Sequence, residues 1–289
     1  MSDRNYVILA DSGSDITPEK AKEWGIGLIP LIYTVEGSDP CPGDKCDIKE
    51  FYSQMRSGKT VTTAAANIED LTEAIEPYVA GGTDIVYIAF SSGLSSTAQT
   101  ACIVCRELSE KYPERRILTV DSLSASLGYG LLVYLASRRR DEGADIDGIV
   151  EFVENTRGRL CHWFTVDDLF HLKRGGRVSA ATAVVGTMLS IKPILHVDDA
   201  GHLVSVDKAR GRKASLVALV ERMKRTAVDP EHQTVFISHG DSPEDAAAVE
   251  KAVREAMAVT DIYTGYIGPV IGAHSGPGTV ALFFIGTER

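Results

Sequence analysis

Asp84-Ile-Val-Tyr-Ile-Ala-Phe90 is apolar from its second residue onward, and the turn Ser91-Ser-Gly-Leu-Ser-Ser-Thr97 follows it directly. A run of this length that ends at a glycine turn is typical of a strand buried inside a sheet. Helical periodicity then continues to about Lys111. A buried strand that leads through a tight polar turn into a helix is the repeating unit of an α/β protein.

The same alternation extends through the first half of the chain. A helix is predicted to begin at Thr17-Pro18, and the other predicted elements are strands at residues 6–10, 27–35 and 116–121 and helices at residues 49–57, 68–78, 124–140 and 145–156. Strands separated by helices pair in parallel, with helices on both faces of the sheet. We therefore expect a three-layer α/β/α domain with a parallel sheet over residues 1–158.

The second half of the chain has a different order of elements. The predicted strands are residues 161–166, 192–197, 202–208, 234–239 and 279–285, and the predicted helices are residues 167–173, 179–188, 212–226 and 243–257. Asp198-Asp-Ala-Gly201 joins two of these strands and is a hairpin signal. A hairpin indicates antiparallel pairing, so we expect a two-layer α/β domain with a mixed sheet over residues 159–289.

Composition excludes several classes of function. The formal net charge of −10 and the pI of about 5.2 argue against nucleic acid as a partner, because phosphate binding needs a basic surface. No apolar run approaches the roughly 18 residues of a membrane helix, and no export signal is evident. We therefore expect a cytoplasmic protein without stable membrane insertion, whose five cysteines are free thiols.

Motifs of common enzymes are also missing from the sequence. It contains no phosphate-binding loop of ATPases, no dinucleotide fingerprint and no Gly-x-Ser-x-Gly elbow, and no pair of histidines has helical zinc-site spacing. Neither a metal nor a cofactor is therefore expected, and catalysis by this chain alone is disfavoured. A hydrolase with His274 as the general base and a serine as the nucleophile would lack an evident orienting acid.

Three polar groups remain as candidates for a binding site. Residues 267–278 contain four glycines, two prolines and His274, which predicts an irregular loop. Ser95 and Ser96 stand where a helix begins; free N–H groups there suit a carboxylate or phosphate, but either serine can equally serve only as a helix cap. Thr62 and Thr63 lie in a predicted turn, either as local turn formers or as binding groups.

The chain resembles the DegV family of bacterial fatty-acid-binding proteins along nearly its whole length. The motifs that carry the resemblance are Asp11-Ser-Gly-Ser-Asp15, Ser91-Ser-Gly-Leu-Ser-Ser-Thr97, Val120-Asp-Ser122, Leu169-Phe-His-Leu-Lys-Arg-Gly-Gly-Arg-Val-Ser179, Lys192-Pro-Ile-Leu195 and Gly268-Pro-Val-Ile-Gly-Ala-His-Ser-Gly-Pro-Gly278. The resemblance implies the two-domain architecture above, with a fatty acid held between the domains.

The resemblance also implies which residues surround the ligand carboxylate: Thr63, Ser95 and His274. Ala64-Ala-Ala66 replaces the family's Ser-Gln-Pro, and Ser96 stands where glycine is usual, so the threonine contact falls at Thr62 or Thr63.

Some members are carrier subunits that present the carboxylate to a separate ATP-using kinase, which makes an acyl phosphate. Arg177 and Arg210 are then candidates for contacts with the kinase or the phosphate. A lipid-sensing regulatory protein is the alternative function.

Overall fold

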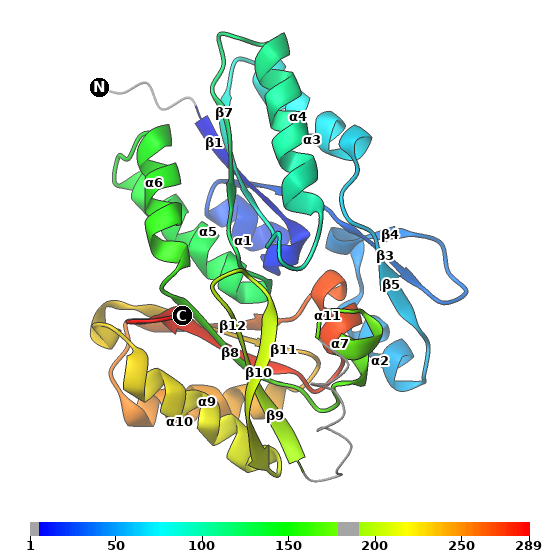
Figure 1. The fold of residues 1–289 in the computed structure, drawn as a ribbon, viewed down its shortest axis with the longest axis vertical. Helices are drawn as coiled ribbons and strands as arrows, with labels where there is room; N and C mark the ends of the chain where they lie inside the picture. Colours follow the sequence, from blue (N-terminus) through cyan, green and yellow to red (C-terminus); the bar gives the residue numbers. More distant parts are fainter. Residues whose placement is uncertain (1–5, 179–190) are drawn as a thin grey trace.

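The computed structural model describes residues 6–178 and 191–289. The helix predicted at residues 179–188 lies outside the described residues. Figure 1 shows two β-sheets, one above the other, with helices on their outer faces and one helix between them.

The first sheet has four parallel strands in the order β2-β1-β6-β7. Its strands are β1 (Tyr6–Asp11), β2 (Ile26–Ile29), β6 (Asp84–Ala89) and β7 (Ile117–Asp121). The helices around it are α1 (Pro18–Glu23), α3 (Ile68–Ala80), α4 (Thr97–Lys111), α5 (Ser126–Asp141) and α6 (Ile146–Arg157). Because side chains alternate along a strand, Ile85 and Tyr87 pack towards α3 and α4, while Val86 and Ile88 pack towards α5 and α6. The predicted parallel sheet is confirmed.

The second sheet has six strands in the order β10-β9-β8-β13-β11-β12, and it is mixed. Its strands are β8 (Leu160–Thr165), β9 (Ile191–Val197), β10 (Leu203–Arg210), β11 (Thr234–His239), β12 (Asp261–Tyr266) and β13 (Val280–Ile285). Its outer face packs on α9 (Arg212–Thr226) and α10 (Pro243–Ala256). The predicted hairpin is the antiparallel pair β9 and β10, so the mixed sheet is confirmed.

Helix α5 lies between the two sheets (Figure 1). It packs on β1 of the first sheet and on β8, β11 and β13 of the second. Almost every residue of its first two turns is buried, which is the pattern expected of a helix enclosed on all sides. Side chains from both sheets, such as Val86 and Phe283, consequently belong to one continuous core around α5.

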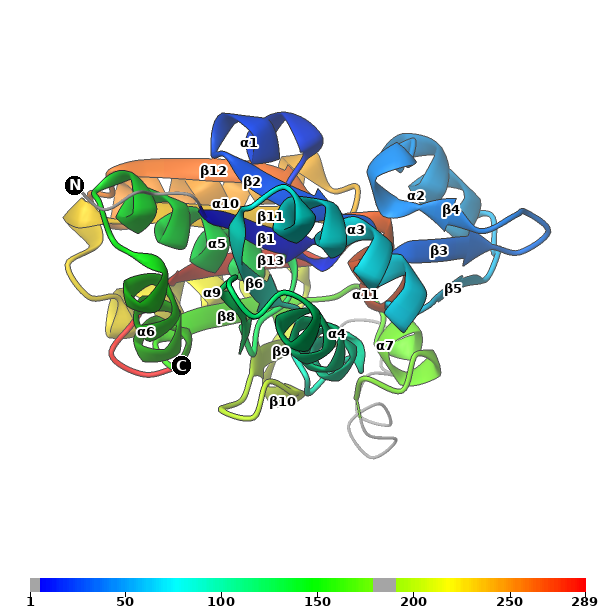
Figure 2. The same cartoon turned by 90° about the horizontal axis from the view of Figure 1, so that it is seen from above.

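A small third sheet stands beside the first one (Figure 2) and corrects two predictions. It has the order β4-β3-β5, with strands β3 (Ile32–Val35), β4 (Cys41–Pro42) and β5 (Val61–Thr63), and α2 (Ile48–Arg56) lies next to it. The strand predicted at residues 27–35, with an interruption at Pro30, is two strands that join different sheets: Pro30 has no N–H to donate, and the chain breaks there as expected. The turn predicted at residues 60–63 is also wrong, because Thr62 and Thr63 pair with β3.

The irregular loop predicted at residues 267–278 is partly helical. Helix α11 (Pro269–Ser275) starts with proline at its first position, where the missing N–H costs nothing, and ends at Gly276, whose φ is +80°. Gly272 lies inside the helix because a Cβ there would approach the Tyr52 hydroxyl to 2.6 Å. Close packing, rather than backbone irregularity, explains this glycine.

The chain passes from the first sheet to the second between α6 and β8, where the division at residues 158 and 159 is proposed. Within residues 6–178 and 191–289, no helix combines the length and the apolar character that a membrane span requires.

Candidate functional site

A cavity lies between the two sheets, at the carboxyl ends of the parallel strands. β1 has β2 on one side and β6 on the other, so the turns after β1 and β6 flank the point where the strand order reverses. Open α/β sheets bind ligands at this point. The space there amounts to about 870 Å³, a volume that includes the solvent at its mouth.

The walls of the cavity are mostly apolar. Phe90 and Leu94 come from the first half of the chain, and Phe164, Ala281 and Phe283 come from the inner face of the mixed sheet. A wall of this kind suits a hydrocarbon, because burial of apolar surface is favourable without any directional contact.

Three of the predicted polar side chains line this cavity. Thr63, at the end of β5, and His274, in the last turn of α11, share a hydrogen bond of 2.8 Å between Oγ1 and Nε2. Ser95, in the turn between β6 and α4, lines the same cavity. The structure thus brings together three side chains that are far apart in the sequence.

Ser95 lies just before α4, whose N-cap residue is Ser96. Ser96 makes no side-chain capping bond. Ser95 Oγ accepts from the Thr97 N–H at 3.2 Å and shares a 2.9 Å hydrogen bond with Thr97 Oγ1. These contacts hold the Ser95 hydroxyl at the positive end of α4, and Ser95 also lines the cavity.

The other predicted site residues are distributed differently. Thr62 and Ser96 are exposed and do not line the cavity. The exposure of Thr62 follows from strand geometry, because neighbouring side chains in β5 point to opposite faces. Arg177 lines the cavity, whereas Arg210 is exposed at the end of β10.

His274 is neutral in this environment. Burial, and then the nearby cations Arg177 and Arg174, lower the pKa of His274 from 6.5 to about 4. Its ring packs on the backbone at Gly175, where a Cβ would come within 2.2 Å of Nδ1. Glycine at residue 175 therefore allows the His274 ring to lie against the backbone, and the sequence did not predict this role.

Arg177 lines the cavity and bonds two segments of the chain to each other. Its Nε donates to the Leu94 carbonyl at 3.1 Å, and its guanidinium also donates to the carbonyl of Gly175. Burial lowers the pKa of this arginine below its usual range.

Four further polar side chains in the cavity wall were not predicted: Ser126, His162, Ser275 and Thr279. Ser275 is buried, and its hydroxyl has no hydrogen-bond partner in the described part of the chain. Its position directly after His274 was the only feature of the sequence that could have marked Ser275 as a site residue. His162 lies in β8, in an apolar run whose pattern gives no sign of a site.

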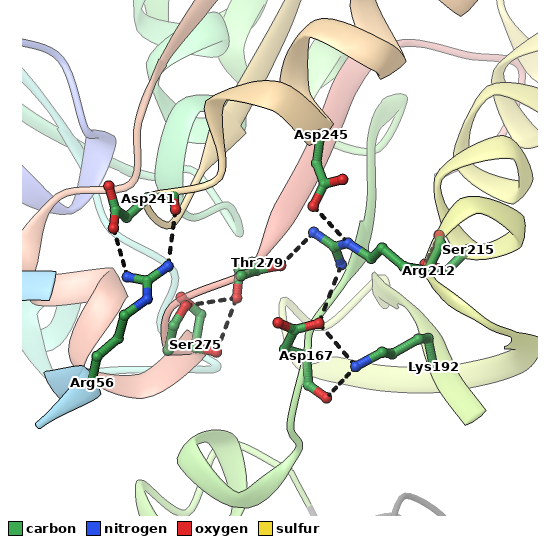
Figure 3. A network of polar contacts seen from close by, with 11 residues as sticks. Arg56, Asp167, Lys192, Arg212, Ser215, Asp241, Asp245, Ser275 and Thr279 are labelled. Atoms are coloured by element: carbon green, nitrogen blue, oxygen red, sulfur yellow. Dashed lines mark hydrogen bonds and ion pairs between the residues drawn. The ribbon is translucent and has the colours of Figure 1, made fainter. Parts of the chain in front are cut away.

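A network of ion pairs and hydrogen bonds holds the segment that follows α11 (Figure 3). Arg212 pairs with Asp245 at 2.8 Å and donates to the Gly278 carbonyl at 2.6 Å. Thr279 Oγ1 donates to the Ser275 carbonyl at 2.9 Å. These contacts fix the C-terminal end of α11 and therefore the position of His274.

Metal ligands do not cluster in the described ranges: no group of three or more His, Cys, Asp or Glu side chains is placed to hold an ion there. All five cysteines are free thiols, as expected.

Comparison with known proteins assigns the family. The profile described as "Uncharacterised protein, DegV family" matches residues 5–287. The chain belongs to the DegV family. A DegV domain-containing protein of Clostridium perfringens is 43% identical over 288 residues, which is 99% of each chain.

Solved DegV structures share the fold. A DegV lipid-binding protein from Thermotoga maritima has a TM-score of 0.85 and 26% identity and covers 99% of both chains. A DegV family protein from Thermus thermophilus, described as binding fatty acid, has a TM-score of 0.88 and 25% identity over 98% of this chain and 99% of its own.

Proposed function

We propose that this DegV protein binds one long-chain fatty acid, with the acyl chain in the cavity and the carboxylate at Thr63, Ser95 and His274. The observation that carries the proposal is the convergence of these three side chains on one cavity whose other walls are mostly apolar. The fatty acid binding described for the Thermus thermophilus relative supports the choice of ligand.

The two parts of the site contribute differently to binding. Roughly 0.8 kcal/mol for each buried CH₂ means that a dozen methylenes supply on the order of 10 kcal/mol before the costs of association. Hydrogen bonds to a charged group add about 1.5–3 kcal/mol each. The acyl chain therefore dominates the affinity. The three polar side chains determine the orientation of the ligand, because they bind its carboxylate end.

A neutral His274 suits the second part of the proposal, presentation of the carboxylate to a separate ATP-using kinase. Neutral imidazole donates one hydrogen bond and carries no charge that would compete for the nucleophilic oxygen. The kinase would transfer the γ-phosphoryl group of ATP to that oxygen, giving an acyl phosphate and ADP. This chain would supply the bound carboxylate, with Arg177 and the exposed Arg210 as proposed contacts for the kinase or the phosphate.

A hydrolase acting alone is disfavoured by the surroundings of His274. The charged groups that shift its pKa are two arginines, whereas an activated serine needs a base oriented by an acid.

The test is fatty acid binding by the purified, delipidated chain, with a matched pair of variants. We expect palmitate and oleate to bind with micromolar or tighter affinity. Thr63→Ala is expected to weaken binding about tenfold, because one hydrogen bond to the carboxylate is lost. Thr62→Ala, at the exposed neighbouring position, is the control and should bind as the wild type does. Absence of fatty acid binding by the folded wild-type protein would refute the proposal.

A further inference from the structure

One strand of the mixed sheet, β13, contributes a row of side chains to the cavity wall. Thr279, directly before the strand, and Ala281 and Phe283, within it, all line the cavity. Because side chains alternate along a strand, the residues between them face the opposite way, into the core under α9 and α10: Val280, Leu282 and Phe284. A ligand that lies along β13 therefore meets a polar, then a small, then a bulky side chain.

The row begins beside the residues proposed to bind the carboxylate. Thr279 Oγ1 donates to the Ser275 carbonyl at 2.9 Å, and Ser275 directly follows His274. Phe283 comes four residues after Thr279, and four residues of strand span about 13 Å. A fatty acid whose carboxylate is held at His274 therefore meets Phe283 with the distal part of its acyl chain.

Phe283 closes the cavity at that distance. Its ring meets His162 edge to face, with 5.4 Å between the centroids. Both rings lie against the backbone of α5, where a Cβ at Gly128 would come within 2.3 Å of His162 Nε2 and 2.6 Å of Phe283 Cδ1. The next residue on the same face of β13, Ile285, pairs with Leu160, which is fully buried in the core. An acyl chain therefore cannot continue along β13 past Phe283.

Ala281 leaves space before this closure. Its partner on β8 is Phe164, whose ring also lines the cavity. Side chains directly opposite each other on antiparallel strands are about 5 Å apart. The single methyl group of Ala281 keeps the space beside the Phe164 ring open, and a longer side chain at this position would extend into it.

We propose that Phe283 determines the longest acyl chain that the cavity accepts, and that the chain reaches it by passing over Ala281. This inference rests on the proposed fatty acid binding and assigns the residue that sets the chain length. Each methylene that is buried before Phe283 should raise the affinity about fourfold. A methylene that would have to pass Phe283 gains nothing, because it must displace packed side chains or remain in water.

The first experiment needs no mutation. Affinities of the delipidated wild-type chain are measured for the straight saturated acids from laurate to behenate. We expect the affinity to rise by about fourfold per methylene up to one length and then to stop rising. An affinity that still rises at behenate would overturn the inference while leaving fatty acid binding intact. Failure to bind any of these acids would instead contradict the proposed function.

The second experiment compares two neighbouring phenylalanines that are both buried, at 2% and 0% exposure, and face opposite sides of β13. Phe283→Ala should shift the preferred acid by at least two carbons towards longer chains, because an apolar space left by truncation can take up an apolar ligand. Phe284→Ala removes the same ring from the outer core and should keep the wild-type preference. Native mass spectrometry of each protein, loaded from an equimolar mixture of the acids, measures the ratio of chain lengths, which a general loss of stability does not change.

Two milder substitutions keep the inference testable if Phe283→Ala does not fold. Phe283→Leu should shift the preference in the same direction by about one carbon, and Ala281→Val should shift it towards shorter acids. An unchanged preference in folded Phe283→Leu would show that Phe283 does not limit the chain. An unchanged preference in folded Ala281→Val would show that the chain does not pass over Ala281, and either result would overturn the assignment.

Discussion

The contacts of the His274 imidazole determine both its position and its protonation state. It bonds Thr63, packs on Gly175 and is neutral at pH 7 because its pKa is about 4. A neutral ring offers a bound carboxylate a hydrogen bond and no charge. His274 therefore orients the carboxylate more than it contributes to affinity.

His274→Ala tests this division of roles. Fatty acid affinity should fall by less than about tenfold, because the acyl chain supplies most of the binding free energy. Acyl-phosphate formation by the kinase should fall by about a hundredfold or more, since an oxygen displaced by about 1 Å loses its reactive geometry. Titration of ligand binding and a kinase assay with the loaded protein measure the two effects. Complete loss of fatty acid binding with the fold intact would contradict the division.

Asp15 is the second residue whose ionisation matters, and it lies between the two halves of the chain. Ser126 Oγ donates to one of its carboxyl oxygens at 2.5 Å, and the Gly268 N–H donates to the other at 2.9 Å. Burial outweighs these hydrogen bonds and raises the pKa of Asp15 from 3.8 to about 7. Below about pH 7, the protonated form is therefore favoured in the folded protein.

A raised carboxyl pKa stabilises the fold at low pH. The folded protein retains the proton of Asp15 while the unfolded chain has lost it, so this contribution is complete below pH 3.8 and is lost as pH rises through about 7. The wild-type protein should lose about 3 kcal/mol of unfolding free energy between pH 5 and pH 8, and Asp15→Asn should not show this loss. Denaturant unfolding at several pH values measures the difference.

Asp147→Asn is the control for Asp15, because this exposed carboxyl pairs with Arg116 and its pKa is lowered from 3.8. It should leave the slope above pH 5 unchanged. If Asp15→Asn has the same pH dependence as the wild type, the raised pKa is wrong.

At the scale of elements, the ends of two helices allow a matched test of close packing. Gly175 and Gly158 are the C-caps of α7 (Phe170–Arg174) and α6, both with φ of −73°. A Cβ at Gly175 would meet His274 Nδ1, whereas a Cβ at Gly158 would meet nothing within 4 Å. The two positions differ in their neighbours and not in their backbone.

Gly175→Ala should displace the His274 ring and lower the unfolding free energy by about 1–3 kcal/mol, as overpacking does. Gly158→Ala should be neutral or stabilise the fold by up to about 1 kcal/mol, because the unfolded chain loses freedom. The imidazole signals of His274 in an NMR spectrum report the displacement directly. Unchanged signals in Gly175→Ala would show that the ring does not depend on this glycine.

The helices and strands also show which parts of the fold can be predicted from sequence patterns. Long runs of one periodicity, such as β6 with α4, were predicted because burial imposes the pattern locally. β5 was missed because it has three residues, and only its pairing with β3 makes it a strand. α11 was missed because Gly272, inside the helix, packs against Tyr52, a contact across the fold that no local pattern encodes.

The candidate site was predictable to the same extent. Each polar motif was visible alone, and the resemblance grouped Thr63, Ser95 and His274. Thr62 and Thr63 could be told apart only from the face of β5 that meets α11. His162 was invisible, since a buried polar residue inside an apolar strand acquires significance only from the cavity beside it.

At the scale of the whole molecule, the cavity joins two halves that already share one core. Besides the contact from Asp15 to Gly268, Tyr52 donates to the Ile267 carbonyl at 2.8 Å, and Arg56 pairs with Asp241 at 2.6 Å. α5 packs on both sheets. A ligand bound between the halves would therefore add to an interface that is continuous without it.

Ligand binding should therefore stabilise the chain as one cooperative unit. A fatty acid at a hundred times its Kd stabilises the folded state by about 2.7 kcal/mol. For a chain of 289 residues, that corresponds to a rise in Tm of roughly 4–5 °C over the delipidated protein. Calorimetry with palmitate measures the shift, and hexanoate is the control, because it has the same carboxylate with too few methylenes to bind well. Because cavity and core are continuous across both sheets, we expect a single transition that moves as a whole; two transitions, of which palmitate shifts only one, would show that the ligand is held by one half alone.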